Sequence, residues 1–140
     1  MRVSWRIALV LAMGCGGPAM RHVPQLSDLS SPYYAATEMG VDTGSTTALD
    51  GNGDLWLASS GPVRTTDGFR FVRAARDDER RRIAEAFNAL PAGPDPTCAS
   101  HSSLTSSMGG AVRTWIVCTD ARGGAVAPYA AAVSSLANIY

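Results

Sequence analysis

The strongest constraint on the fold is a run of five turn formers, Asp-Gly-Asn-Gly-Asp, at residues 50–54. Glycine adopts a positive φ without steric penalty, and Asn and Asp tolerate it, so this run favours a tight turn. The alternation of Leu55 and Leu57 that follows is typical of a strand with one face toward a core. Together with the extended run at 46–49, the turn predicts a β-hairpin across residues 46–58.

Three side chains of this turn, Asp50, Asn52 and Asp54, also match the D-x-N-x-D opening of a calcium-binding loop. An EF-hand loop has a bidentate glutamate at its twelfth position, and Gly61 occupies that position here. Helices flank an EF-hand loop, whereas strand patterns flank this one. The hairpin turn is therefore the favoured interpretation, and no metal site is predicted.

Two apolar stripes with helical spacing predict two helices. The first helix opens on the acidic residues 77–79, which complement the helix dipole, and ends before Pro91. The second begins near Pro128, whose missing N–H costs nothing in a first turn. The stripes consist of Ile83, Phe87 and Leu90 in the first helix and of Tyr129, Val133, Leu136 and Tyr140 in the second.

Further strands are predicted at residues 69–72, 102–107 and 112–118, and residues 62–65 are a candidate partner for the first of them. The order is then strands, helix, strands, helix. This order favours an α+β fold, with a small antiparallel sheet of about four to six strands and two helices packed on one face. A chain of 140 residues suffices for one domain, which we expect at residues 41–140.

The charge balance argues against a nucleic-acid partner. The chain has 12 basic residues, all arginine, and 12 acidic ones, so its formal charge is zero. Loss of residues 1–14 would remove Arg2 and Arg6 and leave 10 against 12, a charge of −2. Nucleic-acid binding needs clustered cations, but the arginines of residues 76–82 are interleaved with acids and are expected on a solvated helix face.

The N-terminus has the pattern of an export signal. Arg2 and Arg6 precede an apolar run of seven residues at 7–13, and the small residue Gly14 follows. As a helix this run would span only about 10 Å, against about 30 Å of membrane hydrocarbon. The pattern therefore predicts a signal peptide rather than a transmembrane anchor.

Residues 11–15, Leu-Ala-Met-Gly-Cys, resemble the lipobox of bacterial lipoproteins. The resemblance implies cleavage after Gly14 and attachment of lipid to Cys15, with residues 1–14 as signal peptide. It also implies a lipid-anchored location in the cell envelope, with the outer membrane as the expected one. Residues 16–40 show no sustained period and hold three prolines, so we expect residues 15–40 to be a lipidated N-terminus and flexible tether. A secretory signal cut elsewhere and a cytosolic chain are the alternatives.

With Cys15 assigned to lipid, the other two cysteines, Cys98 and Cys118, form a pair. A disulfide between them closes a loop of about 20 residues, which adds roughly 3 kcal/mol of stability in an oxidising compartment. The predicted hairpin at residues 102–118 brings its two ends together, where such a bridge forms. A zinc site using His22 and His101, or a reactive thiolate beside His101, is less well supported.

The sequence contains no recognisable catalytic constellation. Gly-x-Ser-x-Gly is absent, and Ser-x-x-Lys is impossible because the chain has no lysine. We therefore expect a non-enzymatic protein without cofactor, whose domain binds an envelope or extracellular protein partner, with Trp115 as a possible exposed contact. The alternative is a small secreted hydrolase built around His101 and a nearby serine or acid.

Overall fold

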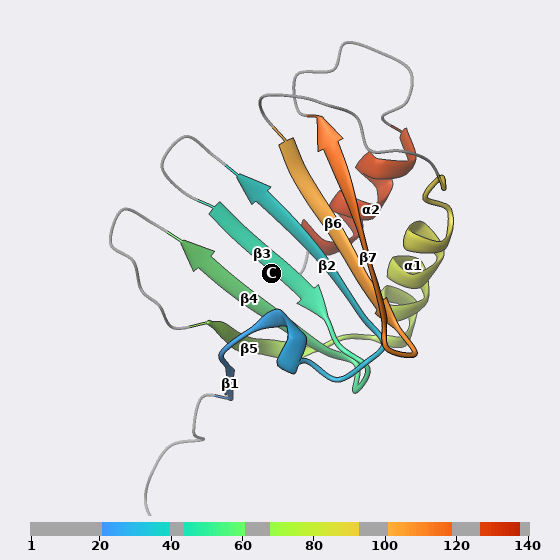
Figure 1. Ribbon diagram of the computed structural model, residues 1–140. Helices are drawn as coiled ribbons and strands as arrows, with labels where there is room; N and C mark the ends of the chain where they lie inside the picture. Colours follow the sequence, from blue (N-terminus) through green and yellow to red (C-terminus); the bar gives the residue numbers. More distant parts are fainter. Residues whose placement is uncertain (1–20, 40–43, 61–67, 93–100, 119–126, 138–140) are drawn as a thin grey trace, which may run out of the picture.

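The computed structural model describes residues 21–39, 44–60, 68–92, 101–118 and 127–137, and these residues form a single sheet with two helices (Figure 1). The elements are β1 (His22–Val23), the 3-10 helix η1 (Leu26–Asp28), β2 (Tyr33–Met39), β3 (Gly44–Leu49), β4 (Asp54–Ser60), β5 (Phe69–Ala74), α1 (Asp77–Asn88), β6 (His101–Met108), β7 (Ala111–Cys118) and α2 (Ala127–Ala137).

The sheet has seven strands in the order β1-β5-β4-β3-β2-β6-β7, and every neighbouring pair is antiparallel. Strands β2 to β5 form a meander, and the β6–β7 hairpin joins the free side of β2. The predicted α+β class is confirmed. The predicted size of four to six strands is wrong, because the segment before residue 41 contributes two strands, β1 and β2.

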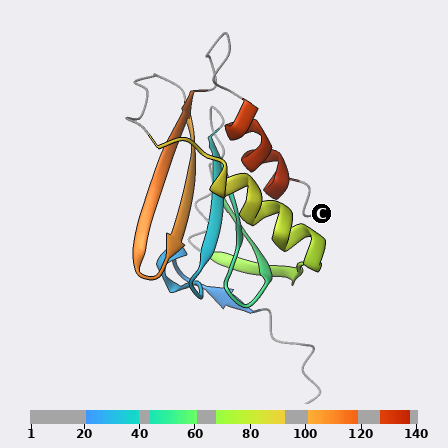
Figure 2. The same ribbon diagram turned by 90° about the vertical axis from the view of Figure 1, so that its right-hand side faces the viewer.

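Both helices lie on one face of the sheet, side by side (Figure 2), where they bury its main core. The stripe predicted for α1 is buried, and Phe87 contacts Tyr34 and Trp115 with ring centroids 5.0 and 6.3 Å apart. The largest fully buried side chains of this core are Leu55, Ile83, Leu104 and Leu136. Each comes from a position that the period of its strand or helix predicts to face inward.

The N-terminal segment, residues 21–32, covers part of the opposite face of the sheet. A second buried cluster lies there, made of Leu29, Tyr33, Ala35, Ala48, Trp56 and Phe69. Residues 21–39, which the sequence analysis assigned to a flexible tether, are therefore folded, and the domain includes them rather than beginning at residue 41. The physical reason is that Leu29 and Tyr33 bury their side chains against Trp56 and Phe69.

The locally predicted elements are found where expected. The β3–β4 hairpin turns at residues 50–53, where Gly53 has φ of 83°, and α1 starts at Asp77. The β6–β7 hairpin turns at Gly109 and Gly110, which have φ of 59° and 85°. Residues 1–14, Cys15, residues 62–65, Cys98 and Tyr140 lie outside the described residues, so the predictions made for them stay predictions.

An ion pair between Glu79 and Arg73 connects the start of α1 to β5. Arg73 donates from both of its terminal nitrogens to the two carboxylate oxygens of Glu79, at 2.8 Å each, and the backbone N–H of Arg76 donates to Oε2 at 2.8 Å. The Glu79 side chain is only 8% exposed. The bonds from Arg73 and then from Arg76 lower the pKa of Glu79 from 4.5 to about 2, despite the opposing effect of burial.

This ion pair predicts a loss of stability in acid. Because the pKa of Glu79 is depressed in the folded state, its contribution is complete above pH 4.5 and disappears as the pH falls from 4.5 toward 2. We expect about 2 kcal/mol, below the full conversion of the shift because solvent screens the partly exposed Arg73. Urea unfolding at pH 7 and at pH 3 measures the free energy of unfolding. It should fall by this amount in the native chain and in the control Glu85→Gln, whose residue lies on the exposed side of α1, but not in Glu79→Gln. An equal fall in all three chains would contradict the prediction.

Candidate binding site

The N-terminal segment is attached to the β3–β4 turn by close backbone contacts. The N–H of Gly51 donates to the carbonyl oxygen of Ser30 at 2.7 Å, and Asn52 Nδ2 donates to Ser30 Oγ at 2.9 Å. A Cβ on Gly51 would lie 2.5 Å from the carbonyl oxygen of Ser31, which real contacts do not allow. Glycine is therefore required at residue 51 by this crossing of the two segments.

The turn itself is organised by the carboxylate of Asp50, which is 5% exposed. Oδ1 accepts hydrogen bonds from the backbone N–H groups of Asn52 and Asp54, at 2.9 and 3.0 Å. Oδ2 accepts the indole N–H of Trp56 at 3.0 Å. Asp50 thus joins the turn to the side chain at the centre of the second buried cluster.

Arg21 closes the same region from the other side. Its guanidinium forms an ion pair with Asp54 at 2.7 Å. It also lies over the rings of Phe71 and Trp56, with centroid distances of 4.7 and 5.3 Å. The side chain is nevertheless 52% exposed, so part of its charge remains available to solvent or to a ligand.

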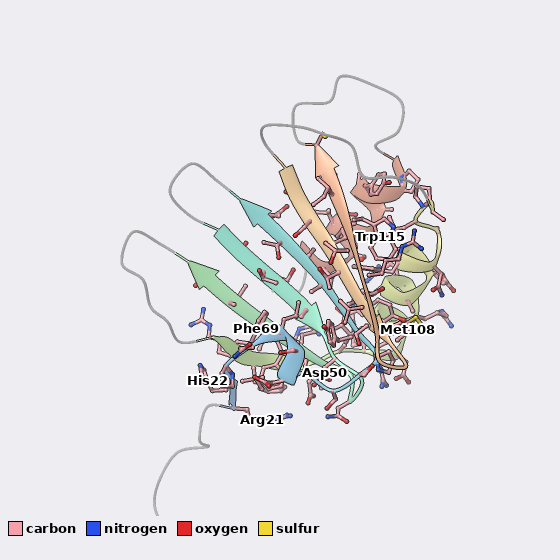
Figure 3. All side chains as sticks on the ribbon, viewed as in Figure 1. Arg21, His22, Asp50, Phe69, Met108 and Trp115 are labelled. Atoms are coloured by element: carbon pink, nitrogen blue, oxygen red, sulfur yellow. The ribbon has the colours of Figure 1, made fainter. Side chains whose placement is uncertain are left out.

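A cavity of about 290 Å³ lies between the N-terminal segment and the β3–β4 turn. Figure 3 shows Arg21, His22 and Asp50 gathered at this end of the sheet, with Phe69 close by. The cavity is lined by Arg21, His22, Val23, Asp28, Leu29, Ser30, Asp50, Asn52 and Trp56. Its size is at the lower end for small-molecule sites, and it combines an apolar floor with a few polar groups of both charges, as such sites do.

The polar groups of this cavity can form hydrogen bonds with a bound ligand. The Asp50 carboxylate accepts three N–H donors, which fix its position in the wall of the cavity. Asp28 accepts the N–H of Gln25 at 3.1 Å with Oδ2. Arg21, Asp28, Ser30 and Asn52 remain as hydrogen-bonding groups for a bound molecule.

Beyond the N-terminal segment, the same face of the sheet presents threonine side chains. Thr37 and Thr46 share a hydrogen bond of 2.9 Å across β2 and β3, and Thr105 and Thr114 one of 3.4 Å across β6 and β7. These pairs satisfy one another, as cross-strand threonines often do. They give the sheet a hydroxyl-bearing surface, whereas the cavity is concave and is the better candidate site.

Trp115, expected as an exposed contact for a partner, is buried. Only 6% of its surface is exposed, it contacts Phe87, and its indole N–H donates to the carbonyl oxygen of Pro91 at 3.2 Å. The prediction that Trp115 is an exposed contact is therefore wrong. The alternation of β7 correctly separates Trp115 from Val112, but the helices cover the face that carries Trp115.

The other predicted site residues are only partly visible. His101 pairs with Cys118 at the end of the β6–β7 hairpin, but its side chain lies outside the described part of the structure, and the neighbouring Ser102 is buried. Cys118 is not a free thiol, whereas Cys98 falls outside the described residues, so their pairing stays a prediction. Within the described ranges no three His, Cys, Asp or Glu side chains group as a metal site would require.

Sequence reasoning missed most of the cavity. Asp50 and Asn52 were recognised as turn residues, but Arg21 and His22 were placed in the tether. No periodic signal marks them, since β1 has only two residues. The sequence signal that could have identified this segment as folded is the apolar pair Val23 and Leu26. Both side chains pack against the second buried cluster.

Comparison with protein-family models and with curated proteins finds no match for this chain. Of the helices in the described ranges, none has the length and apolar character needed to cross a membrane.

The Asp50 network predicts an energetic coupling between the turn and Trp56. In Asp50→Asn, one amide N–H would face the indole N–H of Trp56, and we expect a loss of about 1–3 kcal/mol in the free energy of unfolding. In a Trp56→Phe background no indole N–H faces the amide, so Asp50→Asn should lower the free energy of unfolding by about 1 kcal/mol less. Urea unfolding of the native chain, the two single variants and the double variant measures this difference. Asp77→Asn, whose side chain is 92% exposed, is the control, and strict additivity of the two changes would refute the coupling.

Proposed function

We propose that this protein is a lipid-anchored protein of the bacterial cell envelope, and that its domain binds a polar ligand group in the cavity beside β1 without catalysing a reaction. The observation that carries the proposal is the cavity itself. It is concave, it lies between two segments fixed by hydrogen bonds, and it has polar groups of both charges at its wall.

The N-terminal sequence supports the anchor. A basic start, a short apolar run and the lipobox-like residues 11–15 support lipidation at Cys15. Multiple acyl chains on one cysteine hold a protein firmly on a membrane, whereas a single chain binds only marginally. A disulfide between Cys98 and Cys118 is part of the proposal, since the same export brings the chain to an oxidising compartment.

The chemistry of the cavity indicates the kind of ligand. Arg21 would receive an acceptor such as a carboxylate, while Asp28 would receive a donor, and Ser30 and Asn52 accept either. The volume of about 290 Å³ suits one polar side chain or terminal group better than a whole cofactor. We therefore propose an envelope or extracellular protein as partner, with a polar group of that protein inserted into the cavity.

The anchor is tested by the intact mass of the mature protein, extracted from cells in detergent. We expect a chain that begins at Cys15 and carries lipid, with Cys98 and Cys118 resistant to alkylation until a reductant is added. The matched variant Cys15→Ser should lack the lipid mass and should no longer float with membranes. A native product that begins at Met1, or that has freely alkylated thiols, would overturn the envelope location.

The cavity is tested by a substitution that fills it. Asn52→Trp places a large ring at its wall, whereas Asn88→Trp makes the same chemical change at an exposed position of α1. Both chains are immobilised in detergent and titrated with envelope extract, and saturable binding is measured. We expect Asn52→Trp to weaken that binding by tenfold or more, roughly the effect of losing a central contact, and Asn88→Trp to leave it unchanged. Equal binding by both variants would show that the partner does not use the cavity.

A further inference from the structure

Two large apolar side chains are exposed among the described residues, and both lie at the tip of the β6–β7 hairpin. Met108 is 51% exposed and Val112 is 63% exposed. They flank the turn at Gly109 and Gly110, where an added Cβ would meet nothing within 4 Å. The tip therefore projects away from the rest of the described structure with its apolar side chains uncovered.

The tip lies at the end of the sheet where the chain enters the domain. An ion pair and hydrogen bonds connect the two points: Arg21 pairs with Asp54, the N–H of Gly51 in the neighbouring turn donates to Ser30, and Ser31 Oγ lies 3.4 Å from the carbonyl oxygen of Ser107. Ser107 precedes Met108 directly. Figure 3 shows Arg21 and Met108 at the same, lower end of the sheet, with the strands rising away from both.

The length of chain before Arg21 limits how far this end can be from the anchor. Arg21 follows Cys15 by six residues. At no more than about 3.6 Å per residue, six residues reach about 22 Å. An anchor at Cys15 therefore keeps Arg21 within about 22 Å of the membrane. The tip lies at the same end of the strands as Arg21, on the opposite edge of the sheet from β1.

We infer that the β6–β7 tip is a membrane-contacting element, and that Met108 and Val112 insert into the interfacial region of the bilayer that holds the Cys15 lipid. The inference rests on the anchoring part of the proposed function. Arg113, the next residue of the strand, lies over the ring of Trp115 at 4.6 Å and donates to the carbonyl oxygen of Pro91, so the tip itself presents only apolar side chains. An exposed apolar tip on a protein that is already lipid-anchored suits a surface-bound, non-spanning membrane contact.

Tryptophan fluorescence tests the inference on the full chain. Val112→Trp places a reporter at the tip, and Asn88→Trp places one at the far end of α1, whereas the native Trp56 and Trp115 are buried. The lipidated proteins are reconstituted into phosphatidylethanolamine and phosphatidylglycerol vesicles whose acyl chains carry bromine near the headgroup. A ring at the headgroup–acyl boundary lies about 5–10 Å deep, so we expect the tip reporter to lose about half of its emission and the Asn88→Trp reporter to lose none.

Amide hydrogen exchange gives a second measurement that leaves the tip unaltered. On the same vesicles, the N–H groups of Gly109 and Gly110 should exchange several-fold more slowly than in detergent. In Met108→Asp this protection should be lost, while the exchange of the β2–β3 pairing stays as in the native chain.

The outcomes separate the two proposals. If the protein floats with vesicles but the tip reporter is not quenched, the anchor stands and the inference that the tip contacts the membrane is wrong. The same conclusion follows if self-association, rather than lipid, protects the tip from exchange. If the mature chain carries no lipid on Cys15 and does not float, the anchoring proposal fails and the inference fails with it.

Discussion

The buried carboxylate of Asp50 determines the arrangement of the candidate site. A charged group that is 5% exposed is tolerable only when its oxygens are satisfied, and here three N–H donors satisfy them. Two donors come from the turn and the third from Trp56. The same carboxylate therefore fixes the path of the turn and the position of the indole ring, against which the N-terminal segment packs.

The N-terminal segment buries apolar side chains that the helices do not reach. Helices α1 and α2 cover one face of the sheet, whereas Trp56 and Phe69 lie on the other face and are buried by a different segment. Burial of such aromatic side chains removes a large apolar area from water and is a main source of stability in a small domain. Leu29 and Tyr33 supply the cover, and Gly51 permits the close crossing that brings them there.

Local patterns predicted the elements in which one face is apolar and one polar. The hairpin at 46–58 and the stripe of Ile83 and Phe87 are of this kind, and both are found. Strand β2 was missed because it is central and buried on both sides: Tyr33 and Tyr34, adjacent in sequence, enter different clusters, so no alternation is visible. Trp115 shows a related limit, since a period of two separates the faces of a strand without showing which face the helices cover.

The cavity follows from the same arrangement and from no local pattern, because its walls come from two segments that meet only in the folded chain. Asp50 and Asn52 resemble cation ligands in sequence, whereas in the structure the Asp50 carboxylate accepts the three N–H donors that hold the turn. The wall opposite the turn begins at Arg21, within six residues of Cys15. A lipid on Cys15 would therefore hold the wall of the cavity itself near the membrane, and a partner would have to reach the cavity at the membrane surface rather than far above it.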